Sequence, residues 1–152
     1  MRITDALQKA SARYELRHHS AAFSAQKIAQ EEHTRGMNVA KPVVIIADGV
    51  TYMCVLPACS KIDFEPLRHL LTAEHVELVH EDQLKRLFPD CEIGAQPPFG
   101  SFYGMPTIMD SSLENDDFIL FQAGTHNDAV KMNMADYIRI EQPHVHSFAS
   151  HV

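Results

Sequence analysis

Three short patches of this 152-residue chain hold the residue types best suited to chemistry. They are Met37-Asn38-Val39-Ala40-Lys41, the segment from Gly94 to Gly100, and Gly124-Thr125-His126. A lysine supplies a positive charge, a glycine-rich loop exposes backbone amides, and an imidazole can orient a water molecule. Such groups together suit the binding of a phosphate or the stabilisation of an oxyanion.

Lys41 is the first residue of the apolar run Lys-Pro-Val-Val-Ile-Ile-Ala. Pro42 restricts Lys41 to extended backbone angles and removes one hydrogen-bond donor from the strand. We therefore expect Lys41 at the rim of a sheet, where its side chain can point into a cleft. The alternative from spacing alone is a solvated lysine that flanks a hydrophobic strand.

The segment Gly94-Ala95-Gln96-Pro97-Pro98-Phe99-Gly100 combines flexible and stiff residues. Its glycines let backbone N–H groups approach a ligand closely, and its prolines reduce the entropy lost when the loop is ordered. Phe99 offers an apolar anchor. Taken alone, the same cluster is equally typical of a tight structural turn.

Gly124-Thr125-His126 follows an expected strand. Glycine at a strand end lets the backbone turn close to a ligand, and His126 could orient a water or hydrogen-bond a substrate. A lone histidine is more often a structural or surface residue, and that alternative stays open.

The remaining histidines do not predict a metal site. His18-His19, Glu32-His33 and His144-Val145-His146 lack the spacing of a helix-borne zinc pair, although the tail histidines at 144, 146 and 151 could pick up metal adventitiously. Residue spacing alone assigns no role to His19 or His33. The sequence also lacks the nucleophile elbow, the P-loop and the dinucleotide fingerprint, so we expect no cofactor, no ATP-driven step and no hydride transfer.

Hydrophobic periodicity and turn residues predict one α/β domain over residues 1–141 and a polar, histidine-bearing, mobile tail over 142–152. Asp48-Gly49 predicts a hairpin, so the sheet should be mixed and not purely parallel. The expected helices are Thr4–Tyr14, Ala25–Glu32 with Ser24 as N-cap, Asp63–Thr72, Glu81–Phe88 and Met134–Ile138; the expected strands are Lys41–Ala47, Thr51–Leu56, Val76–Val79, Thr107–Asp110 and Phe118–Gln122.

Composition narrows the class of protein. The formal net charge of −7 argues against broad binding to a nucleic-acid backbone, DNA included, but allows a local basic mouth for the end of one strand. Neither a membrane-spanning run nor a signal-peptide core can be fitted, which predicts a cytoplasmic protein. The three cysteines do not form a disulfide framework and are expected to be buried, reduced thiols.

The three patches, in this order and spacing, resemble the YbaK/prolyl-tRNA-synthetase-associated editing domains from about His19 to Ile140. The resemblance rests on Ala40-Lys41 before the β-branched run, on Gly-x-x-x-Pro-Phe-Gly from Gly94 to Gly100, and on Gly-x-His from Gly124 to His126. It implies a mixed, largely antiparallel, curved sheet flanked by helices. Pro42 is a departure, because members more often have Thr or Ser after the lysine.

The resemblance also implies roles for residues of this sequence. Lys41 would be the residue on which activity depends, with Gly124 and His126 as further catalytic residues. The aminoacyl pocket would be lined by the loop and the neighbouring turn, namely by Gly94, Pro98, Phe99, Gly100 and Thr125. Backbone amides of the loop and of Gly124 would surround the ester carbonyl, while Lys41 holds the carbonyl or the terminal phosphate.

The implied function is hydrolysis of the ester bond of wrongly charged aminoacyl-tRNA in trans, with small amino acids such as Ala or Cys on tRNA-Pro as substrates. The expected partners are the tRNA acceptor end and an aminoacyl-tRNA synthetase. The attacking group is water or the ribose hydroxyl of the substrate. The alternative is a non-catalytic binding module for a free amino acid, a nucleotide or an aminoacyl-tRNA end; a zinc hydrolase built from the histidines would require bound metal.

Overall fold

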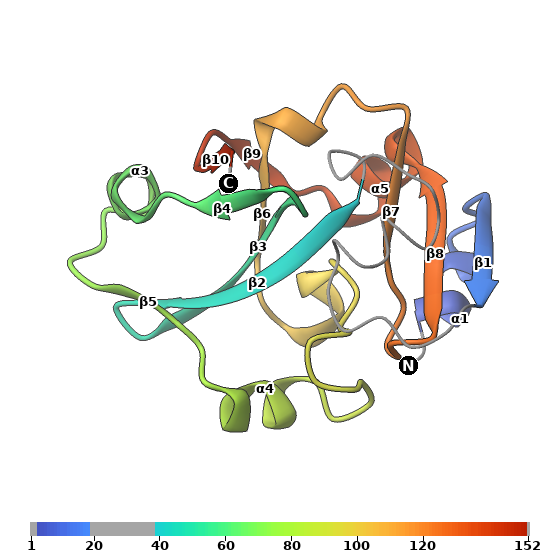
Figure 1. Cartoon of the computed structure of the whole chain (residues 1–152), viewed down its shortest axis with the longest axis horizontal. Coiled ribbons are helices and arrows are strands. Elements are labelled where there is room, and N and C mark those ends of the chain that lie inside the picture. The colour runs from blue at the N-terminus through green and yellow to red at the C-terminus, as the bar shows by residue number, and fades with distance from the viewer. Residues whose placement is uncertain (1–2, 19–38, 152) are drawn as a thin grey trace.

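The computed structural model describes residues 3–18 and 39–151, which form two main sheets with helices around them (Figure 1). The expected helix 25–32, His19 and His33 lie outside the described residues. The described helices are α1 (Ile3–Lys9), α3 (Phe64–Leu70), α4 (Glu81–Leu87), α5 (Met134–Glu141) and the short 3-10 helices η2 (Gly100–Tyr103) and η3 (Ser111–Leu113); the strands are β1 (Tyr14–His18), β2 (Ala40–Ala47), β3 (Val50–Pro57), β4 (Ser60–Ile62), β5 (Val76–Leu78), β6 (Thr107–Asp110), β7 (Phe118–Gln122), β8 (Asp128–Asn133), β9 (His144–His146) and β10 (Ala149–His151).

The larger sheet has the strand order β5-β2-β3-β6-β9 and is mixed. The hairpin of β2 and β3 forms its antiparallel centre, and β3–β6 and β6–β9 are parallel pairs. Asp48 and Gly49 connect β2 to β3 with φ angles of 47° and 86°. Two consecutive positive φ values are typical of the tight hairpin turn that an Asp-Gly pair favours. The hairpin expected from the sequence is therefore confirmed.

The smaller sheet has the order β1-β8-β7 and is antiparallel. The two sheets meet where a parallel bridge joins Val39, just before β2, to Leu120 in β7. From that bridge β2 and β7 diverge, as Figure 1 shows. The predicted class, a mixed and mostly antiparallel architecture flanked by helices, is confirmed, with the strands divided between these sheets and the β4–β10 pair.

The main core lies between the two sheets. It includes Val44 and Met53 from the larger sheet, Phe121 and Val130 from the smaller one, and Tyr137 from α5, all of them buried. The opposite face of the larger sheet packs a second cluster under α3: Ile45, Cys54, Leu56, Leu67, Ile108 and Phe148. Strand β3 supplies both clusters, because its alternate residues point to opposite faces.

Some element boundaries differ from the prediction. The first helix ends at Lys9 instead of Tyr14, and the final helix extends to Glu141. Strand β8 was missed, because Ala129 and Val130 are both buried and interrupt the alternation expected of a half-buried strand. Of the cysteines, Cys54 is buried, whereas Cys59 and Cys91 are partly exposed. None of the described helices is long and apolar enough to cross a membrane.

The prediction of a mobile tail is wrong for residues 144–151. Strand β9 pairs with β6, and β10 pairs with β4. Phe148 between them is only 1% exposed, so it anchors the segment in the second cluster. The buried carboxylate of Asp110 accepts hydrogen bonds from the backbone amides of Phe148 (2.9 Å) and Ala149 (3.0 Å). A long-range partner therefore orders a polar segment that has little structural preference of its own.

Replacing Asp110 with alanine is expected to loosen this C-terminal segment. The change removes the acceptor of the buried Phe148 amide and of the partly buried Ala149 amide, and an unsatisfied buried group costs about 1–3 kcal/mol of folding free energy. The measurement is thermal unfolding together with limited proteolysis. We expect a lower Tm and earlier cleavage after residue 141, whereas unchanged protection of the C-terminus would contradict this role for Asp110.

Candidate functional site

Lys41 is the second residue of β2 and pairs with Leu56 of β3. Its side chain is half-buried. Burial lowers the pKa of the ammonium group below its ordinary value, and the neighbouring Cys59 thiol acts in the opposite direction. Strand β5 pairs with β2 only from Ile45 onward, so among residues 3–18 and 39–151 the stretch that holds Lys41 and Pro42 has only β3 as a ladder partner. This is the rim position that the sequence predicted.

Strand alternation gives the direction of Lys41. Val39 and Leu120 are partners across the parallel bridge and pack in one small cluster with Ala58 and Ala129. Residues two positions apart on a strand share a face. Lys41 in β2 and Gln122 in β7 therefore point to the same side as this cluster, away from the main core.

The side chain of Gln122 contacts the ring of His126. The Nε2 amide of Gln122 lies 3.2 Å from Nδ1 of His126, and Nε2 of His126 lies 2.8 Å from the carbonyl oxygen of Ile93. A carbonyl only accepts, so the ring donates from Nε2 and accepts from Gln122 at Nδ1. His126 is only 6% exposed. Gln122 was not predicted from the sequence. Its only indication there is that a polar residue ends an apolar strand.

The turn at Gly124 is hydrogen-bonded to the Gly94–Gly100 loop. The amide of Gly124 donates to the carbonyl of Ala95, and the amide of Glu92 donates to the carbonyl of Gly124, both at 2.8 Å. Gly94 and Gly124 have φ angles of 82° and 95°, which glycine adopts without strain. The structure therefore brings together two of the patches that the sequence identified, while Lys41 lies in β2, two residues after the Val39–Leu120 bridge to β7.

These contacts change the expected roles of two residues. The amide of Gly124 is already used within the protein, so it does not serve as a donor to the ester carbonyl while this bond is intact. Both ring nitrogens of His126 have protein partners, which makes the ring a support for the loop and not a free general base. We infer that Gly124 and His126 act by positioning the loop.

The second half of the loop is anchored in the core. Phe99 is fully buried and packs edge-to-face against Phe121 and Tyr137, with ring centroids 5.6 Å and 5.0 Å apart. The carbonyl of Pro98 accepts a 2.6 Å hydrogen bond from the Tyr137 hydroxyl. The side chains of Pro98 and Phe99 therefore support the loop from behind. The resemblance implied that they line the aminoacyl pocket; in the structure both side chains are buried.

Two amides of the loop remain available. Within the part of the chain that the structure describes, neither the amide of Gly94 nor that of Gln96 donates a hydrogen bond. Gln96 is only 4% exposed. Donors that are fixed in place but unpaired are what an oxyanion or phosphate site requires. Gln96 was not among the residues predicted from the sequence.

Gly100 is held by close packing. A Cβ atom at this position would lie 2.6 Å from Oγ1 of Thr107 and 2.8 Å from the carbonyl oxygen of Met105. Its amide also donates to Oγ1 of Thr107 at 2.9 Å. The glycine is therefore required by the approach of the loop to β6.

Replacing Gly100 with alanine is expected to reduce stability by about 1–3 kcal/mol, because the new methyl group overpacks this contact. Gly104→Ala is the matched control, since a Cβ there meets nothing within 4 Å and adds only the strain of a φ angle of 75°. Chemical denaturation of both variants is the measurement. A smaller loss at Gly100 than at Gly104 would show that the loop is not tightly packed against Thr107.

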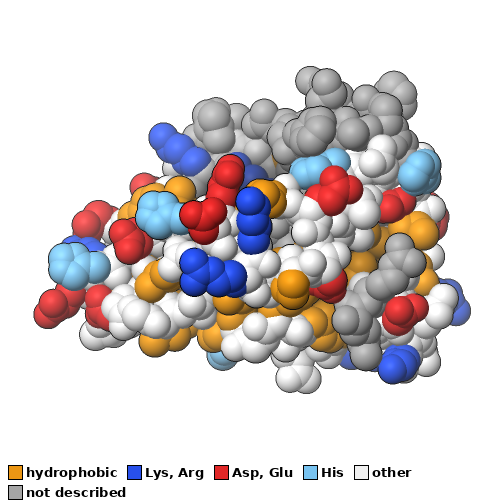
Figure 2. Space-filling model, turned by 90° about the horizontal axis from the view of Figure 1, so that it is seen from below, with side chains coloured by type: hydrophobic (Ala, Val, Ile, Leu, Met, Phe, Trp, Pro, Cys, Tyr) orange, Lys and Arg blue, Asp and Glu red, His pale blue; other side chains and the backbone are white. Residues whose placement is uncertain are grey.

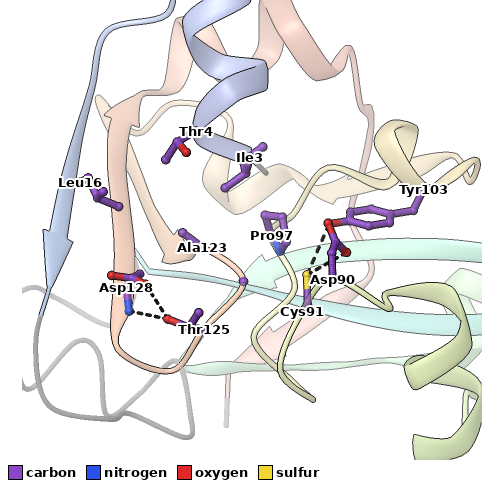
Figure 3. Close-up of a pocket in the computed structure, with 11 residues that line it drawn as sticks. Ile3, Thr4, Leu16, Asp90, Cys91, Pro97, Tyr103, Ala123, Thr125 and Asp128 are labelled. Atoms are coloured by element: carbon purple, nitrogen blue, oxygen red, sulfur yellow. Dashed lines mark hydrogen bonds between the residues drawn. The ribbon is translucent and has the colours of Figure 1, made fainter. Parts of the chain in front are cut away.

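A cavity of about 180 Å³ lies on the other side of the Gly124 turn. Figure 3 shows its lining, which includes Pro97 of the loop, Cys91 with Asp90 and Tyr103, and Thr125 with Asp128. Alternation along β7 and β8 places this cavity on the face of Ala123 and Asp128, opposite the face of Lys41 and Gln122. Burial raises the pKa of the Cys91 thiol to about 11, so this thiol is protonated at neutral pH.

Thr125 shapes the turn beside this cavity. Its hydroxyl accepts hydrogen bonds from the amides of Asn127 (3.2 Å) and Asp128 (3.1 Å), and it donates to the Asp128 carboxylate at 2.7 Å. These bonds fix the turn that carries Gly124 and His126. Among residues 3–18 and 39–151, no group of three or more His, Cys, Asp or Glu side chains is placed to hold a metal ion.

Several known protein structures share the fold of this chain. The fold matches the hypothetical protein APE2540 with a TM-score of 0.88 at 13% identity, covering 97% of this chain and 99% of that chain. It matches a proposed trans-editing enzyme for prolyl tRNA synthetase with a TM-score of 0.83 at 15% identity, covering 97% and 94% of the two chains. The fold also matches a proposed signal transduction protein from Marinobacter aquaeolei with a TM-score of 0.77 at 16% identity. That match covers 97% of this chain but only 30% of the longer protein.

A search of curated proteins found no significant sequence match. At such low identities the structural matches establish the fold. The model of the aminoacyl-tRNA editing domain matches residues 19–140, which include Lys41, the Gly94–Gly100 loop and His126. The chain belongs to the aminoacyl-tRNA editing domain family.

Proposed function

We propose that this protein is an aminoacyl-tRNA deacylase that hydrolyses the ester bond of wrongly charged tRNA in trans. The observation that carries the proposal is the hydrogen-bonded pairing of the Gly94–Gly100 loop with the Gly124–His126 turn, together with a half-buried lysine in β2 close to the bridge between β2 and β7. Family membership supplies the reaction class. Because charged tRNA is used in translation, the activity belongs in the cytoplasm.

In the proposed mechanism the protein supplies electrostatics and not a nucleophile. The amides of Gly94 and Gln96 would stabilise the oxyanion that forms on the ester carbonyl. The Lys41 ammonium would hold the carbonyl or the terminal phosphate by its charge. An aminoacyl ester is already activated, so water or the neighbouring ribose hydroxyl suffices as the attacking group.

We propose small amino acids, Ala or Cys, on tRNA-Pro as the substrates. One structural neighbour is a proposed trans-editing enzyme for prolyl tRNA synthetase, which supports this choice and a synthetase as partner. The net charge of −7 is consistent with contact to the acceptor end only. On the face seen in Figure 2, acidic and basic side chains are interspersed and do not gather into a basic patch.

A binding module is the second candidate. It would hold a free amino acid, a nucleotide or an aminoacyl-tRNA end without turnover. The observation in its favour is that both ring nitrogens of His126 are engaged, which leaves the ring unable to act as a general base in this arrangement.

The experiment that separates the two candidates uses labelled Ala, Cys, Ser and Pro, each esterified to tRNA-Pro, together with Ala on its own tRNA. Hydrolysis and equilibrium binding are measured with the same samples. Selective hydrolysis of Ala or Cys on tRNA-Pro supports the deacylase and identifies the amino acid. Binding without hydrolysis of any ester supports the binding module.

A further inference from the structure

Helix α5 presents two buried polar side chains to the Gly94–Gly100 loop and its continuation into η2. They are Tyr137, which is fully buried, and Glu141, which is 7% exposed. The two are four residues apart and therefore lie on one face of the helix. The Tyr137 hydroxyl donates to the carbonyl of Pro98 at 2.6 Å.

Glu141 accepts several hydrogen bonds just after the loop. Its Oε2 accepts from the Ser101 amide at 3.1 Å and from the Thr107 hydroxyl, and its Oε1 accepts from the Ser101 hydroxyl. Thr107 in turn accepts from the amide of Gly100 at 2.9 Å. One carboxylate therefore connects α5, β6 and the end of the loop.

Burying the Glu141 carboxylate costs folding free energy. Burial raises the pKa of Glu141 because it penalises the charged form, and the hydrogen bonds from Ser101 and Thr107 oppose that shift. Hydrogen bonds to a charged acceptor are shorter and stronger than neutral ones, so a charged Glu141 holds Ser101 and Thr107 firmly. The other end of the loop is held separately, by the Gly124 turn and His126.

We propose that Tyr137 and Glu141 are positioning residues for the deacylation reaction. Both fix the carboxyl end of the loop through Pro98, Ser101 and Thr107, and thereby hold the loop that carries the amides of Gly94 and Gln96. The proposal rests on the proposed function. Displacement of a reacting group by about 1 Å lowers rates roughly 100-fold, so a loop braced at one end only is a poor oxyanion site.

The test compares Tyr137→Phe and Glu141→Gln, which keep side-chain size and remove one hydroxyl or one charge. Arg139→Gln is the control on the same helix, because Arg139 is exposed and binds Asp136 and the carbonyl of Ala10. Hydrolysis of Ala-tRNA-Pro is measured well below each variant's Tm. We expect kcat to fall about 10- to 100-fold in the two loop variants with KM within about threefold of wild type, because only the transition state uses the amides fully.

Hydrogen exchange at the amides of Gly100 and Ser101 gives a readout that is independent of activity. We expect about tenfold faster exchange in Glu141→Gln and no change in Arg139→Gln. Unchanged exchange, an unchanged kcat, or an equal loss of kcat in Arg139→Gln at the same Tm would each overturn the positioning role. An inactive wild-type protein would overturn the proposed function instead and, with it, the catalytic part of this inference.

Discussion

Replacing Lys41 with alanine is expected to lower the rate of deacylation at least about 100-fold while the protein stays folded. Losing a preorganised charged or oxyanion contact costs about 2.7–4 kcal/mol of transition-state stabilisation. The half-buried position strengthens the effect, since burial reduces the screening of the charge by water. Single-turnover release of labelled amino acid is the measurement, with circular dichroism to confirm the fold.

Two controls make this prediction specific. Lys61→Ala removes an exposed lysine from β4 and should leave the rate unchanged. Lys41→Arg keeps the charge and should retain part of the activity. Because burial lowers the pKa of Lys41, wild-type activity above the uncatalysed rate should decline as pH rises through that lowered value, where the ammonium loses its proton. Full activity in Lys41→Ala would contradict the mechanism.

Replacing Phe99 with alanine is expected to cost about 3–5 kcal/mol of folding free energy, the usual range for a large aromatic removed from a core. For a protein of this size the Tm should fall by roughly 10 °C. The reason is packing: the Phe99 side chain is fully buried in the core, with Phe121 and Tyr137 as edge-to-face neighbours.

Phe102→Ala is the matched control for Phe99. Phe102 stacks on Phe99 with centroids 5.2 Å apart but is 43% exposed, so it should cost less than about half as much. Chemical denaturation of both variants provides the comparison. If Phe99→Ala were the milder change, the loop would be anchored elsewhere than in the core.

Local sequence signals predicted the elements that carry their own information. Asp48-Gly49 between two β-branched runs specified the central hairpin, and Pro42 placed Lys41 at the start of a strand. Residues 144–151 and strand β8 were not predicted. The order of residues 144–151 depends on Asp110 and the second cluster, which are distant in the sequence. Strand β8 has buried residues on both faces, so it lacks the alternation of a half-buried strand.

The candidate site shows the same limit. Residue types indicated Lys41, the loop and Gly124-Thr125-His126 as candidates, and the resemblance to the editing domains favoured a functional role for them. They could not show that the Gly124 amide is bonded to Ala95 or that His126 is held between Gln122 and Ile93, because these hydrogen bonds join segments that are apart in the sequence. The sequence did not indicate the roles of Gln96, Tyr137 and Glu141, because these roles depend on where the loop lies in the fold.

The most direct test of the account is the release of labelled alanine from mischarged Ala-tRNA-Pro by the wild-type protein. The account predicts release well above the uncatalysed rate, without added metal or cofactor. No release above the uncatalysed rate, from a protein shown to be folded, would contradict it.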